Sequence, residues 1–388
     1  MQSDSSSFDP VSMAAPGVRG LHPYIPGKPI SELERELGIS DVLKLASNEN
    51  PLGTSPKALA AIQQELQELA LYPDGSGHDL KAILAQRHGV DPACITLGNG
   101  SNDVLVLLAE AFLTPEHGAV FSQYCFAVYP IATQAVGAIA QEVPALPDDH
   151  GEMPLGHDLK AISERIDNST RLVFIANPNN PTGTWLDSAE LEAFVANAPK
   201  HVLVVIDEAY FEYQDPEHVV DASAWVNKYP NLIVSRTFSK AYGLAGLRVG
   251  YLLSSPEVAD LVNRVRQPFN VNSLALAAAS AALGDDDFIQ NSRELNRSGL
   301  QRLNQALPEL GFRVYPSAGN FVLVDMGSDS GPWYEALLRD GIITRRVGNY
   351  GLPNHLRITI GTEQQMDRLL ASVERLRDEL GTAQQAGA

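Results

Sequence analysis

The chain has 388 residues, of which 44% are hydrophobic and 19% are charged, a composition typical of a folded globular protein and not of a disordered or fibrous one. This length exceeds one ordinary core, so we expect a main domain and a smaller second domain. The formal net charge of −19 argues against nucleic acid or an anionic membrane as a partner, and no apolar run reaches the ~18 residues that span a bilayer.

The beginning of the chain, Met1–Pro10, is polar and carries two aspartates, which is not the pattern of a secretory signal. We expect residues 1–18 to form a disordered extension and residues 19–50 to form an N-terminal segment. The two cysteines, Cys94 and Cys125, have no metal or redox spacing, and the nine histidines include no HxH or HExxH pattern. We therefore expect buried or half-buried thiols, no metal site and a cytoplasmic location.

From about residue 95 to residue 283, apolar β-type runs alternate with helical patterns, which indicates βαβ units and a largely parallel sheet. The expected strands are Ala119–Ser122, Ile139–Val143, Leu172–Ala176, Val202–Ile206, Leu232–Ser235 and Gly250–Leu253. Polar residues gather where these runs end, and open α/β sheets bind their ligands at that edge. We assign residues 51–283 to this large domain.

After Gly284 the pattern changes, because long charged helical stretches alternate with shorter strands. The expected helices are Asp286–Leu307 and Gln364–Leu380, and the expected strands are Phe321–Asp325, Ile342–Arg345 and Leu356–Ile360. This alternation predicts a smaller α+β domain over residues 284–388.

A glycine-rich loop, Gly98–Asp103, precedes the helical run Val104–Phe112. Small residues at a helix start expose unpaired backbone N–H groups, and the helix dipole favours an anion there. A simple N-cap explains Ser101 or Asn102 equally well, and the loop is not the GxGxxG of dinucleotide-binding folds.

Three further motifs follow the buried strands in chain order. The first is the turn-rich run Asn177–Gly183, and the second is Asp207-Glu208-Ala209-Tyr210. In the third, Lys240 stands among small residues and Arg248 follows eight positions later. An amine, a carboxylate, a phenol and a cation in this order suit pyridoxal phosphate, which needs a lysine for its Schiff base, an acid for its ring nitrogen and a cation for its phosphate.

Each of these residues also has an ordinary structural explanation. A loop lysine such as Lys240 is usually a solvated charge, and Asp207 at a strand end could cap a helix. Arg248 could pair with an acidic neighbour, as is common in an acidic chain. Their joint occurrence in order, at strand ends, favours the functional interpretation over these alternatives.

With these motifs the chain resembles the fold-type I aminotransferases, a family of pyridoxal-phosphate enzymes. The shared features are Asn-Pro-Thr-Gly at residues 180–183, Asp207 with Tyr210, and the run from Thr237-Phe238-Ser239-Lys240 to Arg248. Within this family the chain is similar to the histidinol-phosphate aminotransferases. That similarity rests on Tyr24–Pro29, Leu45–Gly53, Tyr72-Pro73-Asp74 and Tyr350–Pro353 running into Leu356-Arg357-Ile358.

The resemblance spans roughly residues 22–380 and implies an architecture. We expect a large domain with a mainly parallel seven-stranded sheet flanked by helices, and a smaller α+β domain that the N-terminal segment joins. The family also implies a homodimer with shared active sites, while the net charge of −19 argues against a nucleic-acid or membrane partner.

Roles for single residues around pyridoxal 5'-phosphate follow from the resemblance. Lys240 would form the Schiff base and then move a proton, and its pKa should be lowered by burial near cationic groups. Asp207 would pair with the ring nitrogen, Tyr210 and Asn180 would bond the ring's phenolic oxygen, and Phe126 would stack on the ring. The phosphate would be held by Ser101, Asn102, Thr237, Ser239 and Arg248, with Tyr72 reaching it from the neighbouring subunit.

The implied reaction moves an amino group between L-histidinol phosphate and 2-oxoglutarate, giving imidazole acetol phosphate and L-glutamate. Arg357 would bind the acidic group of either substrate, and Tyr24, Asn50 and Arg345 would complete the phosphate end. Arg346 follows Arg345 where many relatives have proline, so either arginine could face the substrate.

Other functions are compatible with the same motifs. Close relatives transaminate aromatic amino acids, and a threonine-phosphate decarboxylase shares much of the pattern; all of them need the lysine and an anion-binding arginine. Aminotransferase-like domains also serve as effector sensors in transcription regulators. Those regulators carry a basic DNA-binding module, for which this acidic chain has neither the length nor the charge.

Overall fold

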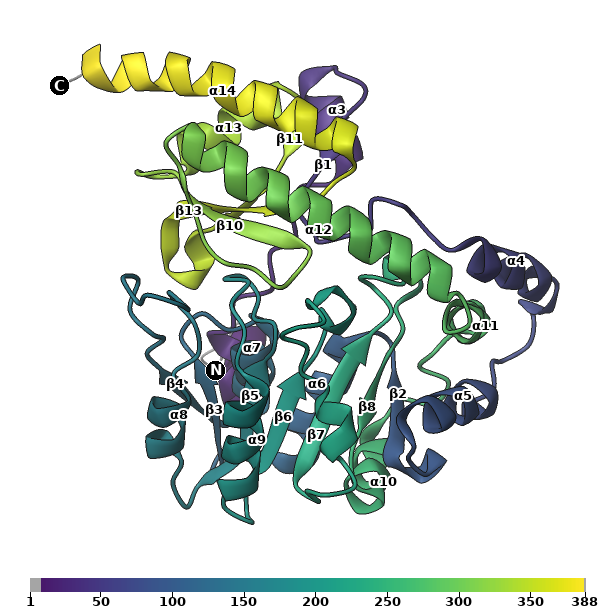
Figure 1. Cartoon of the computed structure of the whole chain (residues 1–388). Coiled ribbons are helices and arrows are strands. Elements are labelled where there is room, and N and C mark those ends of the chain that lie inside the picture. Colours follow the sequence, from purple (N-terminus) through teal and green to yellow (C-terminus); the bar gives the residue numbers. More distant parts are fainter. Residues whose placement is uncertain (1–7, 387–388) are drawn as a thin grey trace, which may run out of the picture.

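A seven-stranded sheet lies at the centre of the computed structural model, which describes residues 8–386 (Figure 1). Its strand order is β2-β8-β7-β6-β5-β3-β4; β8 is antiparallel to β2 and β7, and the remaining pairs are parallel. The strands are β2 (Ile95–Gly98), β3 (Gly118–Ser122), β4 (Ile139–Val143), β5 (Thr170–Ala176), β6 (Leu203–Asp207), β7 (Leu232–Thr237) and β8 (Gly250–Leu253). The predicted mainly parallel seven-stranded sheet is confirmed. Of the seven strands, only the edge strand β2 is absent from the predicted ones.

Helices cover both faces of this sheet, as parallel strands buried on both sides require. On one face, Phe121 and Phe174 pack against α6, α7 and α10. On the other face, Val120 and Val173 pack with side chains of α5, α8, α9 and α11. The helices of this part are α4 (Pro56–Glu65), α5 (His78–His88), α6 (Ser101–Phe112), α7 (Val128–Ala135), α8 (Leu159–Arg165), α9 (Ser188–Asn197), α10 (Pro256–Val265) and α11 (Ser273–Ala282).

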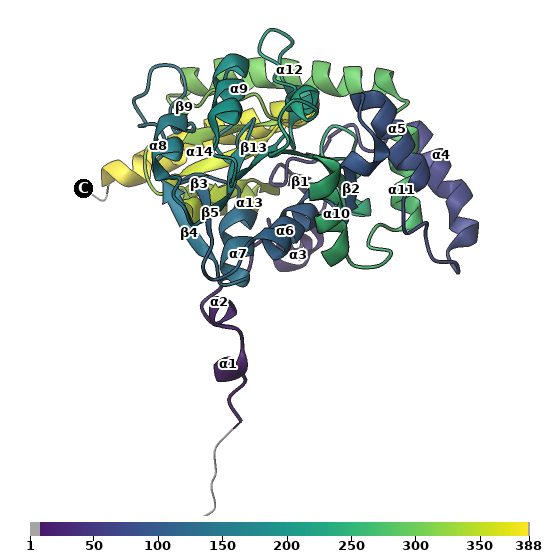
Figure 2. The same cartoon turned by 90° about the horizontal axis from the view of Figure 1, so that it is seen from below.

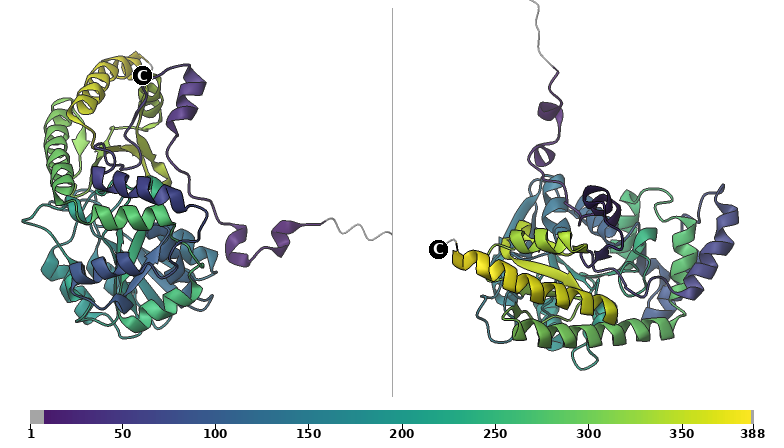
Figure 3. Two further views of the ribbon diagram at one scale, coloured as in Figure 1. Left: turned by 90° about the vertical axis from the view of Figure 1, so that its right-hand side faces the viewer. Right: turned by 90° about the horizontal axis from the view of Figure 1, so that it is seen from above.

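A four-stranded antiparallel sheet with the order β12-β13-β10-β9 lies beside the carboxyl ends of the large sheet's parallel strands (Figures 1 and 3). Its strands are β9 (Arg313–Val314), β10 (Phe321–Asp325), β12 (Arg345–Val347) and β13 (Leu352–Thr359). The helices that pack with it are α12 (Asp286–Glu309), α13 (Gly331–Arg339) and α14 (Glu363–Ala386). The single strand predicted over Ile342–Arg345 is in fact two, because β11 (Ile342–Ile343) leaves this sheet to pair elsewhere.

The N-terminal segment packs on this smaller sheet although the large domain separates them in sequence. Strand β1 (Leu43–Lys44) pairs in parallel with β11, and Leu33 of α3 (Ile30–Leu37) is buried against Leu338. Figure 3 shows α3 beside the helices of the C-terminal part. The exact domain limits at residues 50 and 283 stay a prediction.

The predicted disordered extension over residues 1–18 differs from the structure where the structure describes it. Residues 1–7 lie outside the described part, but Pro10–Met13 and Pro16–Arg19 form the short helices α1 and α2. The Asp9 carboxylate accepts a hydrogen bond from the backbone of Val11 and caps α1, while the Gln134 amide of α7 donates to the Gly17 carbonyl. Figure 2 shows α2 beside α7 and α1 projecting beyond it.

Within residues 8–386, no helix combines the length and the apolar character that crossing a bilayer demands. Cys94 and Cys125 are buried and unpaired, as predicted from their apolar surroundings.

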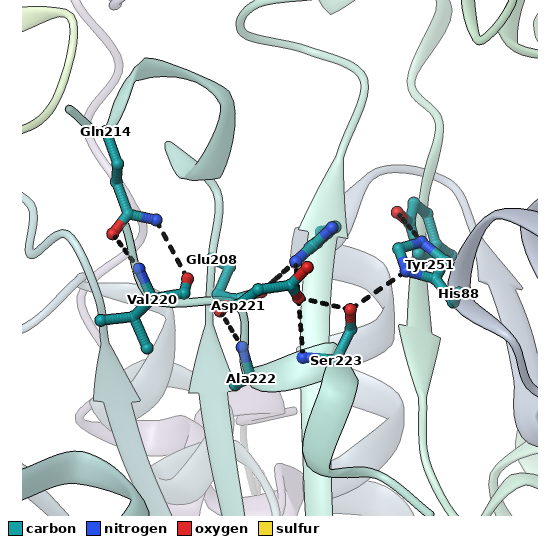
Figure 4. Close-up of polar contacts among 9 residues, drawn as sticks. His88, Glu208, Gln214, Val220, Asp221, Ala222, Ser223 and Tyr251 are labelled. Atoms are coloured by element: carbon teal, nitrogen blue, oxygen red, sulfur yellow. Dashed lines mark hydrogen bonds and ion pairs between the residues drawn. The ribbon is translucent and has the colours of Figure 1, made fainter. Parts of the chain in front are cut away.

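A buried ion pair joins the ends of the neighbouring strands β6 and β7 (Figure 4). Arg236 is 4% exposed and Glu208 is 1% exposed, and Glu208 Oε2 accepts from Arg236 Nε at 2.9 Å and from Nη2 at 2.7 Å. Arg236 Nη2 also donates to Asp221 Oδ1 at 2.7 Å, and the Ala222 N–H donates to Glu208 Oε1 at 2.8 Å. Asp207 is the chain neighbour of Glu208, and Thr237 is the chain neighbour of Arg236. The ion pair therefore helps to hold Asp207 and Thr237 in place at the strand ends.

Replacing Arg236 with leucine should destabilise the fold, because the Glu208 carboxylate would stay buried without its cation. We expect a loss of roughly 3–5 kcal/mol, measured by urea unfolding. Arg264→Leu is the matched control, since Arg264 pairs with Asp260 at the surface, with exposed side-chain fractions of 68% and 61%. Equal losses in the two variants would contradict a structural role for the buried pair.

Candidate active site

A cavity lies at the carboxyl ends of β5, β6 and β7, and strands β12 and β13 of the smaller sheet contribute to its wall. It encloses about 860 Å³, its open mouth included. Most of the residues that the sequence predicts for a site line it: Tyr24, Ser101, Asn102, Phe126, Asn180, Asp207, Tyr210, Thr237, Ser239, Lys240, Arg248, Arg345 and Arg357. Segments more than 300 residues apart in the chain therefore meet at one place.

Lys240 lies in the loop that follows β7 and is the amine of this cavity. Its Nζ donates to the Ser47 carbonyl at 2.9 Å. Burial lowers the pKa of Lys240 to about 7, and the nearby Arg357 and Arg248 guanidinium groups act in the same direction. A lysine with this pKa is a neutral nucleophile and a usable base near neutral pH.

Asp207 ends β6 and is 4% exposed. Its Oδ2 accepts a hydrogen bond from the Tyr129 hydroxyl at 2.8 Å, whereas its Oδ1 has no partner among the described residues. Burial raises the pKa of Asp207 to about 6, and the Tyr129 bond opposes that rise. A buried carboxylate oxygen without a partner fits a ligand that brings a cationic N–H donor.

The amino-terminal end of α6 and Arg248 form an anion subsite. Gly100, with φ 91°, lets the chain pass so close that a Cβ there would lie 2.5 Å from Arg248 Nη2. Arg248 Nη1 donates to Ser239 Oγ at 3.3 Å and to the Ala245 carbonyl at 3.0 Å. Across residues 8–386 no carboxylate forms an ion pair with Arg248, so its charge is available to a ligand. Helix N–H groups, hydroxyls and a guanidinium together suit a phosphate.

Two arginines of the smaller sheet line the opposite end of the cavity. Arg357 is 5% exposed; its Nη1 donates to Asn180 Oδ1 and its Nη2 to the Ala46 carbonyl, both at 2.6 Å, while its Nε has no partner in the described part of the chain. Arg345 lies directly across from Arg357 in the β12–β13 pairing and donates to the Ile25 carbonyl at 2.6 Å. Two cations opposite each other on adjacent strands are unfavourable without an anion between them.

Arg346 points away from the cavity, because successive side chains of a strand alternate between its faces. Its Nη2 pairs with Asp329 at 3.3 Å on the surface, with exposed side-chain fractions of 43% and 63%. Of the two adjacent arginines, only Arg345 lines the cavity.

Two predicted site residues lie outside the cavity. Tyr72 is 82% exposed and its ring stacks on Phe269, with centroids 4.7 Å apart. Asn50 is buried, and its Nδ2 donates to the Ala241 carbonyl and to Ser292 Oγ, both at 2.8 Å. Asn50 therefore holds the backbone next to Lys240, and its side chain does not reach the cavity.

The prediction missed Asn48 and Tyr129. Asn48 lines the cavity and donates to the Tyr210 hydroxyl at 2.8 Å, and Tyr129 donates to Asp207. Asn48 lies in the motif Leu45–Gly53, but a sequence pattern does not tell which of its polar side chains turns inward. Tyr129 lies in the first turn of α7 and Phe126 precedes that helix, so no helical spacing in the sequence relates the two side chains.

Comparison with known proteins gives a consistent result. The family model "Aminotransferase class I and II" matches residues 40–373. The chain is 58% identical to "Histidinol-phosphate aminotransferase 2" of Pseudomonas fluorescens, covering 95% of this chain and 99% of that protein. It is 57% identical to "Histidinol-phosphate aminotransferase 2" of Methylococcus capsulatus, covering 94% and 98%. A crystal structure of histidinol-phosphate aminotransferase from Sinorhizobium meliloti in complex with pyridoxal-5'-phosphate superposes with a TM-score of 0.86 at 31% identity, covering 97% and 99%.

The lowered pKa of Lys240 predicts a specific reactivity in the ligand-free protein. Reductive methylation of Lys240, followed by peptide mass spectrometry, should rise with pH around a midpoint near 7. In Arg357→Met the midpoint should move up, because one positive neighbour is gone. Lys160, whose side chain is 86% exposed, gives the reference rate in the same digest. A midpoint for Lys240 near the ordinary lysine value of ~10.4 would contradict this assignment.

Proposed function

The chain belongs to the class I and II aminotransferases, and we propose that it transfers the amino group of L-histidinol phosphate to 2-oxoglutarate with pyridoxal 5'-phosphate as cofactor. The products are imidazole acetol phosphate and L-glutamate. The observation that carries this proposal is one cavity holding a lysine of pKa about 7, an unpartnered aspartate oxygen and an anion subsite.

These residues fit the cofactor. Asp207 Oδ1 would receive the protonated ring nitrogen, and the subsite at Gly100 and Arg248 would hold the phosphate. Phe126, which lines the cavity and packs edge-on against Tyr129, would cover a ring face. When bound, pyridoxal phosphate supplies an electron sink for the charge that remains when a Cα–H bond breaks.

Lys240 does the covalent and proton-transfer work. With a pKa of about 7, about half of its amine groups are free of a proton at neutral pH, so it can bind a carbonyl carbon and, after release, accept a proton from substrate Cα. The Ser47 carbonyl holds the Nζ in place while it is protonated. Because donor and acceptor substrates use the same cavity in turn, we expect ping-pong kinetics.

The paired arginines favour a phosphate-bearing substrate over an uncharged aromatic one. Arg345 and Arg357 face each other across two strands, and a doubly charged phosphate relieves their repulsion better than a phenyl ring would. Tyr24, whose ring lies beneath Arg345 at 5.9 Å, would close this end. The same arginines would take the second carboxylate of 2-oxoglutarate or glutamate.

An aromatic amino-acid aminotransferase and a threonine-phosphate decarboxylase remain the alternative functions, because both need the same lysine and an anion-binding arginine. We also propose a cytoplasmic location, where small phosphorylated metabolites of this kind are made and used.

Single-turnover experiments rank the three substrates. Holoenzyme mixed separately with L-histidinol phosphate, L-phenylalanine and L-threonine phosphate is followed by cofactor absorbance, and released carbon dioxide is measured. We expect the fastest change with histidinol phosphate and no carbon dioxide.

In Lys240→Ala, turnover should vanish while the fold persists, and borohydride should attach the cofactor to the Lys240 peptide of the unaltered protein. A faster reaction with phenylalanine, decarboxylation, or label on another lysine would overturn the proposal.

We further propose a homodimer in which Tyr72 completes the phosphate subsite of the partner. Tyr72 lies outside its own cavity, on a surface with other exposed apolar side chains: Leu59 (48%), Leu66 (47%), Leu69 (57%), Leu71 (66%) and Phe269 (46%). Such a patch on a globular protein marks an interaction surface, and a second copy of the chain would cover it.

Hybrid dimers of Lys240→Ala and Tyr72→Phe chains test this arrangement. If Tyr72 acts across the boundary, each hybrid has one complete site, which should bind pyridoxal phosphate as tightly as the unaltered enzyme. The other site lacks both groups. If Tyr72 instead serves its own chain, the only site with Lys240 should show the weaker affinity of the Tyr72→Phe homodimer.

A further inference from the structure

Asn48 is a buried residue whose polar groups are all used. It is 1% exposed and has φ 56°. Its backbone N–H donates to Thr359 Oγ1 at 3.0 Å, and its carbonyl accepts from the Asn320 amide at 3.0 Å. Its side-chain Oδ1 accepts from the Thr359 hydroxyl at 3.1 Å, and its Nδ2 donates to the Tyr210 hydroxyl at 2.8 Å. Contacts from three separate parts of the chain thus fix this residue, two of them through its side chain.

Thr359 determines which way the Asn48 amide points. The threonine oxygen already accepts the Asn48 backbone N–H, so its own hydrogen requires an acceptor, and Asn48 Oδ1 is that acceptor. The amide nitrogen is then turned toward Tyr210. Because an amide nitrogen only donates, the Tyr210 oxygen must be the acceptor in this bond, and its hydrogen has to point elsewhere.

The cavity is the direction left for that hydrogen. Tyr210 is 3% exposed and lines the cavity, and its ring is held by edge-on packing against Phe321 with centroids 5.2 Å apart. Burial raises the pKa of Tyr210 to about 12, with Arg357 and the Asn48 bond opposing that rise, so the phenol keeps its hydrogen at neutral pH. The charged and titratable groups that face it are Arg357, Asp207, Lys240 and Tyr24.

The backbone at Asn48 supports a dedicated role. A left-handed φ is unfavourable for most residues, and asparagine is among the few that tolerate it. In a buried position such a conformation persists where the surrounding contacts require it. Here it turns the side chain inward between Thr359 and Tyr210.

We propose that Asn48 is a positioning residue for Tyr210 and directs the phenolic O–H into the cavity as a hydrogen-bond donor. The inference rests on the proposed function, together with the role that the family resemblance implies for Tyr210, whose hydroxyl would meet the phenolic oxygen of pyridoxal phosphate. A fixed donor at that point selects the deprotonated form of the cofactor oxygen. Asn48 therefore acts on the cofactor's ionisation without touching it.

Asn48→Gly is the decisive variant, because glycine adopts the left-handed conformation freely and only the amide is lost. The readouts are the dissociation constant of pyridoxal phosphate and the pH midpoint of the holoenzyme's visible absorbance. Loss of a donor to an anionic oxygen raises that midpoint, so we expect an upward shift of up to about one unit, in the same direction as Tyr210→Phe but smaller. Cofactor affinity should fall several-fold.

Two further variants test the polarity of the bond. In Asn48→Asp the carboxylate accepts the phenolic hydrogen and withdraws it from the cavity, so the shift should equal or exceed that of Asn48→Gly. In Asn48→Gly combined with Tyr210→Phe, the shift should not exceed that of Tyr210→Phe alone, since both changes remove the same donor. Asp41→Gly is the control for introducing glycine at a left-handed residue, because Asp41 has φ 64° and a side chain 95% exposed.

The outcomes separate this inference from the proposed function. A shift in Tyr210→Phe with none in Asn48→Gly, or additive shifts in the double variant, would overturn the role of Asn48 alone. No shift in Tyr210→Phe would mean that Tyr210 does not meet the cofactor oxygen, which would overturn the role of Asn48 but leave the amino-transfer reaction to the substrate and Lys240→Ala experiments. The positioning role would be established if three results agree. The pH midpoint shifts in the same direction in Asn48→Gly and in Tyr210→Phe, and the two shifts do not add in the double variant. Asp41→Gly leaves the midpoint unchanged.

Discussion

Three consecutive residues of the N-terminal segment hold three reactive side chains of the cavity, and the arrangement of the site depends on this contact. The bonds join Ala46 to Arg357, Ser47 to Lys240, and Asn48 to Tyr210. The segment itself is held by β11 and by β13 of the smaller sheet, since the Leu45 N–H donates to the Ile343 carbonyl at 2.7 Å and the Thr359 N–H donates to the Leu45 carbonyl at 2.9 Å. The position of the smaller sheet therefore determines where the reactive groups of the large domain are held.

The electrostatics of the cavity are opposite to those of the chain. The formal net charge is −19, yet the cavity combines Lys240, Arg248, Arg345 and Arg357 with a single carboxylate, Asp207. Burial first, and this concentration of positive charge second, depress the pKa of Lys240, and the same charges prepare the site for anions. Backbone carbonyls, and not carboxylates, accept the hydrogen bonds of Lys240 and Arg345, so their charges are oriented but not neutralised.

Local sequence patterns predicted the scaffold well. Buried apolar runs marked the strands, and the polar residues at their ends marked Asp207, Thr237 and Lys240 as neighbours, because parallel strands end at one edge of the sheet. The failures arose where contacts between distant parts of the chain decide the structure. The strand expected over Ile342–Arg345 is divided because β1, some 300 residues earlier in the chain, pairs with its first half. A pairing between such distant segments leaves no periodic signal in either of them.

The sequence by itself determined which chemical groups are present and at which strand ends or helix starts they stand. It also determined the covalent spacing of Lys240 and Arg248 and the glycine that lets the chain approach that arginine. Only the tertiary structure decided that Asn48 and not Asn50 faces the cavity, and that Arg345 and not Arg346 lies opposite Arg357. The reason is physical: neighbouring side chains point in different directions, and the partners that choose between them belong to parts of the chain that meet only on folding.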